Sequence, residues 1–150
     1  MEEGGGRLLS GAAAMKLLVC EDGHEYTERF RRFLGGQFEF VRAQSYAEAA
    51  ALAPSCSALL LDLDFRRTDP SQLVDEHGAP APRSAAEVQG ILILRALRAR
   101  GVDQPALLFA DLDDSARAQR LESELAPLHV VPSGEGLADI ARRLDRLTAR

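Results

Sequence analysis

Five short apolar runs alternate with segments of helical periodicity from residue 16 onward, and this alternation restricts the possible folds more than any other feature. The runs span residues 16–20, 38–41, 58–61, 106–110 and 128–131. Strands that alternate with helices pack as a parallel sheet with helices on both faces. The third run is apolar throughout, as expected of a central strand that is buried on both faces. The sequence therefore predicts a doubly wound α/β domain with five strands.

Capping and breaking signals set the expected helices. Apolar residues at helical spacing predict a helix that begins near Tyr26 and ends at Gly35. Ser45 and Glu48 form a capping-box pattern, which opens a second helix that ends before Pro54. Three further helices are expected at about residues 91–100, 115–126 and 137–147.

The composition indicates one globular domain without a nucleic-acid or membrane partner. An apolar content of 46% over 150 residues allows a substantial core. The net charge of −5, with no basic stripe, argues against nucleic-acid binding. No apolar run approaches the ~20 residues that span a bilayer, so a cytoplasmic location is expected. Residues 1–14 are Gly-rich and aperiodic, which predicts a disordered tail before a domain of residues 15–150, with Met15 as a candidate natural start.

The cysteine and histidine positions argue against a disulfide and a zinc site. Cys20 ends one predicted strand and Cys56 precedes the start of another, so the two thiols should lie too far apart to join. The histidines have no metal-type spacing with one another or with the cysteines. They are His24, His77 and His129.

Carboxylates follow two of the predicted strands. Glu21 and Asp22 come after the first strand, and Asp62 comes after the third. Ligands of an open parallel sheet bind beyond the carboxyl ends of its strands, so these three side chains are expected to share one pocket. Hard oxygen ligands suit a magnesium-like ion, and the sequence predicts a weak site for one. The plainer alternative is that acidic residues simply begin the polar loops.

Residues 65–89 form an irregular stretch that is longer than most loops in compact domains. Pro70, Pro80 and Pro82 exclude one long helix, although residues 72–77 have room for a turn or two. The stretch leaves the same sheet edge as Asp62, so we expect a lid or docking segment beside the acidic pocket. A tolerated surface insertion is the alternative. Deleting residues 68–86 is expected to leave the fold intact, because no core stripe is removed.

The order and spacing of these features resemble the receiver domain of two-component response regulators, over about residues 16–147. The matching features are the acidic pair after the first strand, Ser45-Tyr46-Ala47-Glu48-Ala49, Asp62-Leu63-Asp64, Gly90 and Val130-Val131-Pro132. The resemblance implies a flavodoxin-like sheet in the order 2-1-3-4-5. It also implies that Glu21 and Asp22 hold magnesium and that Asp62 accepts a phosphoryl group from a phosphohistidine. The bond between Val131 and Pro132 would be cis, as is common in the family.

The same resemblance shows where phosphorylation-dependent switching should fail. The family places Ser or Thr at the end of the fourth strand, where Ala110 stands, and Lys before the fifth-strand proline, where Val131 stands. Leu128 takes the place of the aromatic residue that typically swings inward. Charged hydrogen bonds contribute about 1.5–3 kcal/mol each, so losing two removes several kcal/mol of preference for the switched state. Asp111 adds a like charge that would oppose a phosphoryl group.

The leading hypothesis is a stand-alone, atypical receiver domain without enzymatic activity. It would act as a signalling module through protein contacts, with weak or no phosphorylation-dependent switching. Its partner would be a histidine kinase, a downstream effector or a second copy of the chain. The family's usual contact face is made by the fourth helix, fifth strand and fifth helix, and arginines are expected at its rim. These are Arg117, Arg120, Arg142 and Arg146.

Two alternatives keep chemistry at the acidic edge. In the first, Asp62 accepts a phosphoryl group in a phosphorelay with Mg²⁺, and Arg66 or Arg67 replaces the missing cation. In the second, Asp62 and Asp64 imitate the nucleophile and acid of a haloacid-dehalogenase-like phosphatase, although that family has Thr where Arg66 stands here.

Overall fold

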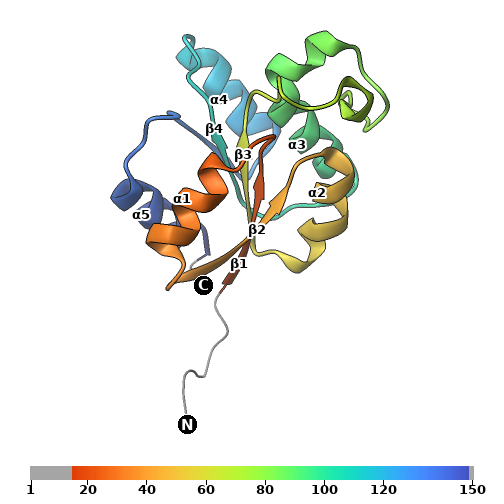
Figure 1. The fold of residues 1–150 in the computed structure, drawn as a ribbon. Coiled ribbons are helices and arrows are strands. Elements are labelled where there is room, and N and C mark those ends of the chain that lie inside the picture. The colour runs from red at the N-terminus through yellow and green to blue at the C-terminus, as the bar shows by residue number, and fades with distance from the viewer. Residues whose placement is uncertain (1–14, 149–150) are drawn as a thin grey trace.

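The computed structural model describes residues 15–148, which form a five-stranded parallel sheet with helices on both faces (Figure 1). The strand order is β2-β1-β3-β4-β5, which confirms the predicted flavodoxin-like topology. The predicted tail, residues 1–14, lies outside the described residues, as do residues 149–150. Within residues 15–148, every helix is too short or too polar to cross a bilayer.

The strands begin and end within two residues of their expected positions. They are β1 (Met15–Cys20), β2 (Phe38–Ala43), β3 (Ala58–Asp62), β4 (Ala106–Phe109) and β5 (Leu128–Val131). Neighbouring strands pair in parallel, with Leu17 opposite Ala58 and Leu59 opposite Ala106. The first four residues of β3 have no exposed surface, because helices cover both faces of the sheet at its centre.

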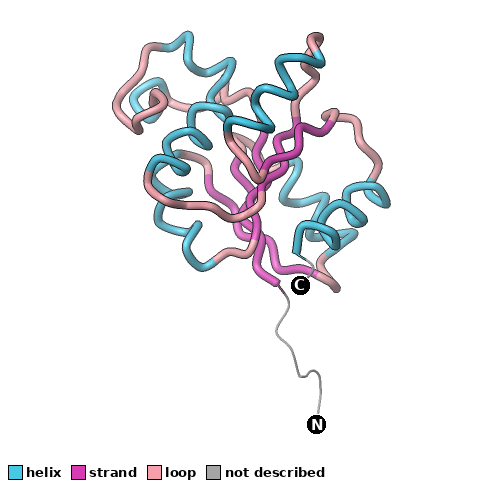
Figure 2. The backbone as a smooth tube through the Cα atoms, turned by 180° about the vertical axis from the view of Figure 1, so that it is seen from behind, coloured by secondary structure: helices cyan, strands magenta, loops and turns pink. Residues whose placement is uncertain are grey.

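The helices divide into two layers (Figure 2). One face of the sheet is covered by α1 (Glu25–Leu34) and α5 (Leu137–Thr148). The other face is covered by α2 (Tyr46–Leu52), α3 (Gln89–Ala99) and α4 (Ser115–Glu124). Each layer has its own apolar cluster, and alternate residues along the strands face one cluster or the other.

Side-chain capping starts α2, and a glycine follows the end of α3. The hydroxyl of Ser45 accepts a hydrogen bond from the Glu48 N–H at 3.3 Å, as the capping box predicts. The Glu48 carboxylate accepts from the N–H of Gln44 at 2.8 Å, one residue earlier than expected. Beyond α3, Gly101 has a φ of +91°, a left-handed conformation that favours glycine.

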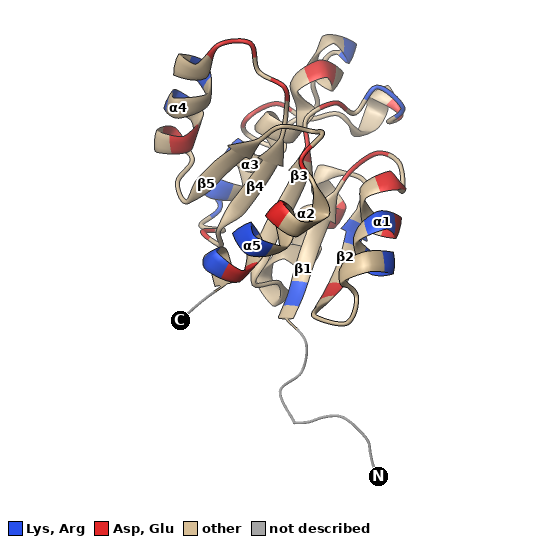
Figure 3. Ribbon diagram, turned by 90° about the vertical axis from the view of Figure 1, so that its left-hand side faces the viewer, with Lys and Arg blue, Asp and Glu red and all other residues tan. Residues whose placement is uncertain are grey.

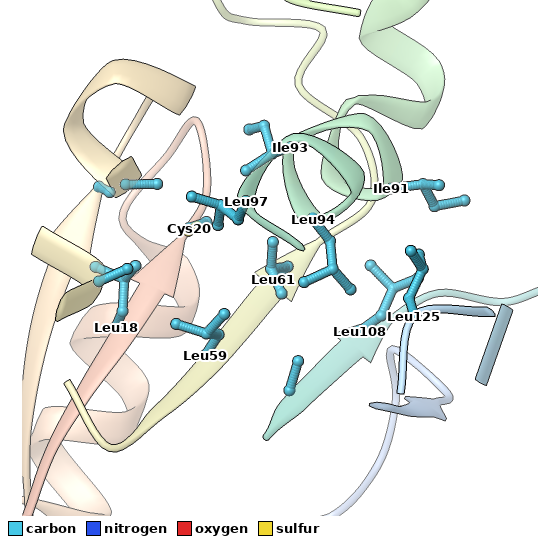
Figure 4. Packing of buried hydrophobic residues seen from close by; sticks show 14 of the residues in the cluster. Leu18, Cys20, Leu59, Leu61, Ile91, Ile93, Leu94, Leu97, Leu108 and Leu125 are labelled. Atoms are coloured by element: carbon cyan, nitrogen blue, oxygen red, sulfur yellow. The ribbon is translucent and has the colours of Figure 1, made fainter. Parts of the chain in front are cut away.

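Helix α3 contributes the most deeply buried side chains of its layer. Ile93, Leu94 and Leu97 have no exposed surface. They pack against leucines of β1, β3 and β4 (Figure 4). Cys20 lies in the same cluster as a fully buried, free thiol, and Cys56 is also free. This packing fixes α3, and with it the segment that leads into the helix.

Residues 65–89 have local structure of their own. Two 3₁₀ helices span Pro70–Gln72 and Arg83–Val88, and Val74 pairs with Pro80 in an antiparallel bridge. The buried Gln89 side chain donates a hydrogen bond to the Val74 carbonyl and accepts one from the Val74 N–H, both at 2.9 Å. The helical turns expected at residues 72–77 are replaced by this bridge, because its backbone groups pair with one another and with Gln89.

The same segment supplies core residues, contrary to the prediction of a segment without core contacts. Phe65 is 0% exposed and Leu73 is 1% exposed, and both belong to the cluster that surrounds α3. Val74, Ala85 and Ala86 are also buried. The argument that deletion of residues 68–86 removes no core contact is therefore wrong. Sequence patterning missed these residues because they lie on an irregular chain and so follow neither a helical nor a strand period.

The proline bond after β5 also differs from expectation. Among the described residues, the cis X-Pro bond is Ala126–Pro127, which precedes β5, and Val131–Pro132 is trans. The turn that follows Pro132 is held by a hydrogen bond from the Ser133 N–H to the Asp111 carboxylate at 3.0 Å. Contacts with the neighbouring β4 loop therefore fix the path of this turn.

Replacing Leu73 with Ala should lower the free energy of unfolding by about 2–4 kcal/mol, because the change leaves a cavity in a packed core. Gln72→Ala is the matched control at an exposed neighbour and should change it by less than about 0.5 kcal/mol. Denaturant unfolding followed by circular dichroism measures both variants. Equally small effects would contradict a core role for this segment.

Candidate functional site

Acidic residues occupy the loops that follow β1, β3 and β4 (Figure 3). The three strands end nearly level, because Cys20 pairs with Leu61 and Asp62 pairs with Phe109. The loops beyond these ends place the predicted acidic residues along one edge of the sheet. They are Glu21, Asp22, Asp62, Asp64 and Asp111.

Glu21 caps helix α1 instead of facing an ion site. Its side chain is 1% exposed, and its carboxylate accepts hydrogen bonds from the N–H groups of Tyr26 at 3.1 Å and Thr27 at 2.7 Å. The Thr27 hydroxyl donates to the same carboxylate at 2.6 Å. The first turn of a helix has unpaired N–H groups and a partial positive charge, so it stabilises a buried carboxylate. Glu21 therefore holds the start of α1 against β1.

Asp22 is held by the long segment that follows β3. Its side chain is 5% exposed, and the Arg67 backbone N–H donates to its Oδ2 at 2.8 Å. The guanidinium of Arg67 lies 3.4 Å from Oδ1 of the same carboxylate. Both oxygens of Asp22 thus have a donor from a residue 45 positions along the chain.

The Arg67 guanidinium also forms a two-point contact with Glu25 in the first turn of α1. The two nitrogen–oxygen distances are 2.9 and 3.1 Å. Hydrogen bonding to Arg67 lowers the pKa of Glu25 to about 2, and the same pair raises the pKa of Arg67. Arg66, the other candidate cation, pairs with Asp64 at 2.8 Å and does not join this network. Arg67 is therefore the cation that pairs with Asp22 and Glu25.

Two further residues shape the loop that carries Asp22, and the sequence patterns did not single them out. Arg42, on β2, donates to the Gly23 carbonyl at 2.5 Å and to the Asp22 carbonyl at 3.3 Å. A Cβ at Gly23 would lie 2.2 Å from both the Arg67 guanidinium and the Glu25 carboxylate, so a larger residue would require that ion pair to shift. An arginine on a strand opposite an acidic loop was the available signal for Arg42.

Asp62 ends β3 in a partly buried position with few hydrogen-bond partners. Its Oδ1 accepts a hydrogen bond from the Leu63 N–H at 2.9 Å. Burial raises the pKa of Asp62 to about 6; the Leu63 hydrogen bond opposes this shift, and the charges of Asp22, Glu21 and Asp64 add to it. Asp62 therefore lies close to the other carboxylates and has fewer hydrogen-bond and ion-pair partners than they have among the described residues.

Helix α3 comes into direct contact with the end of β3 at Gly90. A Cβ on Gly90 would lie 2.0 Å from the Asp62 carbonyl oxygen, and the Gly90 N–H donates to the Leu63 carbonyl at 3.0 Å. Glycine is required here by backbone proximity. The contact fixes the position of Asp62 relative to α3.

The three positions predicted to be degenerate are all apolar and buried. Ala110 is 5% exposed, Val131 is 0% exposed and Leu128 is 4% exposed. The Ala110 N–H donates to the Val131 carbonyl at 2.9 Å, which places the two residues side by side at the edge. Neither side chain carries a polar group that could contact a charge on Asp62.

Asp111 closes the edge on the β4 side. Its carboxylate accepts hydrogen bonds from the N–H and the hydroxyl of Ser133, and these lower its pKa. Tyr26 stacks on Phe109 with 5.0 Å between ring centroids. Burial raises the pKa of Tyr26 to about 12, with further contributions from the charges of Asp62 and Asp111. Tyr26 is thus a neighbour of the acidic edge that helical periodicity had assigned only to the core.

The predicted magnesium ligands are held by contacts within the protein. Among residues 15–148, no three Asp, Glu, His or Cys side chains are placed to hold a metal together. The reason is that Glu21 is turned toward α1 and both oxygens of Asp22 are occupied by Arg67. Magnesium binding would require Arg67 to release Asp22, so it remains a prediction.

Solved receiver domains share this fold over nearly their whole length. The receiver domain of Francisella response regulator 1452 is 15% identical with a TM-score of 0.65, covering 89% of this chain and 96% of that one. The chemotaxis protein CheY4 of Vibrio cholerae is 14% identical with a TM-score of 0.65, covering 90% and 99%. The BeF3-activated N-terminal receiver domain of RstA from Klebsiella pneumoniae is 18% identical with a TM-score of 0.64, covering 90% and 99%.

The chain therefore has the fold of response-regulator receiver domains. No protein-family model matches the sequence, and no curated protein matches it. At identities below 20% the likeness is one of fold. The function must be argued from the site itself.

Asp62→Asn should stabilise the protein at neutral pH. Folding raises the pKa of Asp62 from 3.8 to about 6, so the ionised side chain destabilises the folded state, and this cost grows as the pH rises from about 4 to about 6. For a partly exposed group we expect a gain of about 1–2 kcal/mol near pH 7 and almost none below about pH 4. Chemical denaturation across this pH range measures it. Asp113→Asn, at an exposed position, is the control, and equal pH dependence in both variants would contradict the assignment.

Proposed function

We propose that this chain is a receiver-type signalling module that acts through protein contacts, with weak or no phosphorylation-dependent switching. The observation that carries the proposal is the contact of Arg67 with Asp22 and Glu25. It gives the acidic edge a cation from the chain itself. The edge is then held together without a metal ion or a phosphoryl group.

A phosphoryl group on Asp62 would find few partners beyond that cation. The side chains at the ends of β4 and β5 are those of Ala110 and Val131, which have no donor, and Asp111 adds a negative charge nearby. Charged hydrogen bonds contribute about 1.5–3 kcal/mol each, and shifting a two-state population from 1:99 to 99:1 needs about 5.5 kcal/mol. Two missing contacts thus remove most of the free energy that a full switch needs.

The proposed contact surface is the α4–β5–α5 face. Exposed arginines lie on both helices of this face, and Figure 3 shows basic positions on α4 and α5. They are Arg117, Arg120, Arg142 and Arg146. Arg142 is paired with Asp139 on its own helix, which leaves the other three as the basic rim. Such a rim favours an acidic partner surface, on a histidine kinase, a downstream effector or a second copy of the chain.

A second candidate function is phosphoacceptance at Asp62, and its partial exposure supports it. Its carboxylate would attack the phosphorus of a phosphodonor, forming an acyl phosphate and releasing the donor group. Arg67 would have to turn from Asp22 toward the phosphoryl oxygens to supply the missing cation. The phosphatase alternative has less support, because Asp64, its acid, is paired with Arg66.

Beryllofluoride, which mimics a phosphoryl group on Asp, should produce only local changes. We expect amide shifts near Asp62 and none on α4 or α5, because Ala110 and Val131 give the group no contact through which to move β4 and β5. Two-dimensional amide spectra measure this, with Asp62→Asn as the control that abolishes the local shifts. Widespread shifts on α4 and α5 would favour the phosphoacceptor function instead.

Arg67→Gln should strengthen Mg²⁺ binding by about two- to fivefold, because an exposed ion pair contributes up to about 1 kcal/mol. Titration with Mg²⁺, followed by the amide signals of residues 21–24, gives the dissociation constants. Arg66→Gln is the matched control, since Arg66 pairs with Asp64 and leaves Asp22 untouched. An unchanged constant in Arg67→Gln would show that Arg67 does not compete with the ion.

A further inference from the structure

A polar pocket lies beside the acidic edge, on the segment between β3 and α3. Its volume is about 360 Å³, which is near the lower end of the ~300–1,000 Å³ range of small-molecule sites. The lining residues come from both ends of this segment. They are Arg66, Thr68, Pro70, Leu73, Arg83, Ser84, Ala86 and Glu87.

The pocket wall contains a polar group that the protein leaves unsatisfied. The hydroxyl oxygen of Thr68 is buried and has no hydrogen-bond partner among the described residues. Buried polar atoms are nearly always paired, and an exception calls for an explanation. Because that oxygen has almost no accessible surface, a ligand in the pocket would reach the hydroxyl after rotation of the Thr68 side chain toward it.

The charges around the pocket favour an anion. Arg66 uses its Nε atom in the pair with Asp64, and its terminal nitrogens have no partner among the described residues. Arg83 forms no ion pair within residues 15–148, and the exposed Ser84 adds a hydroxyl. Guanidinium groups bind phosphate and carboxylate in a forked geometry. Glu87 is the one carboxylate in the lining, so it should weaken the binding of an anion without preventing it.

The apolar residues of the lining indicate which kind of chemical group carries the charged end of the ligand. Pro70, Leu73 and Ala86 form an apolar wall, and Leu73 is held in the core. An apolar surface beside two guanidinium groups suits a short organic body that carries one charged end.

We propose that this pocket binds a small organic anion, a phosphate or a carboxylate with a short apolar group. Arg66 and Arg83 would bind the charged end, the Thr68 hydroxyl would turn to pair with one of its oxygens, and the exposed Pro70 would contact the apolar part. The site is separate from Asp62 and does not depend on phosphorylation. It lies next to Arg67, since Arg66 and Thr68 flank that residue in the chain.

Titration with phenyl phosphate and with phenylacetate, followed by amide shifts, tests the proposal on the full chain. At least one anion should give saturable shifts at residues 66–73 and 83–87, and uncharged benzyl alcohol should give none. Saturation by one anion alone identifies the charged group as phosphate or carboxylate. No saturation by either anion, or equal shifts with benzyl alcohol, would overturn the proposal.

Variants separate binding from folding. Arg83→Gln should weaken binding about tenfold or more, and Glu87→Gln should strengthen it about twofold or more. Thr68→Val should weaken binding severalfold without loss of thermal stability, because its hydroxyl has no protein partner to lose. Arg29→Gln, at an exposed position on α1, is the control and should bind as the unaltered chain does. Binding that is unchanged in Arg83→Gln would overturn the assignment.

Discussion

The burial of β3 on both faces is the constraint on which the rest of the structure depends. Its first four residues have no exposed surface, so the chain can become polar only where it leaves the sheet, at Asp62. Gly90 lets α3 approach the Asp62 carbonyl closely, and the carboxylate stays partly desolvated. The same packing that stabilises the domain therefore raises the pKa of Asp62. This packing also fixes the position of the Asp62 carboxylate, and so the place where a phosphoryl group would have to bind.

A carboxylate-rich edge needs a positive charge, and the chain supplies it from the segment between β3 and α3. Arg67 contacts Asp22, in the loop after β1, and Glu25, the first residue of α1. Phe65 and Leu73 anchor the segment that carries Arg67 in the core. This anchoring holds the exposed Arg67 side chain beside Asp22 and Glu25. The ion pair itself contributes little free energy at the surface, so its effect is to occupy Asp22.

The two polar features beside β3 differ in how completely the protein satisfies them. At the acidic edge, Glu21 and Asp22 have their hydrogen bonds from α1 and Arg67. In the neighbouring pocket, Arg83 and the Thr68 hydroxyl have no partner among the described residues. The first arrangement favours a self-contained interaction module and the second favours a ligand. The pocket lies on the segment between β3 and α3, and the same segment supplies Arg67 to the acidic edge.

The sequence by itself determined the sheet, its five strands and the edge at which the acidic residues gather. Apolar periodicity is local, and the parallel direction of the strands follows from their alternation with helices. It did not determine that Glu21 turns toward α1, that Arg67 rather than Arg66 meets Asp22, or that Leu73 enters the core. These depend on contacts between residues far apart in the chain, and an irregular segment has no period from which to read them. Only the tertiary structure decided them, because side-chain direction at a sheet edge is set by the packing of neighbouring elements.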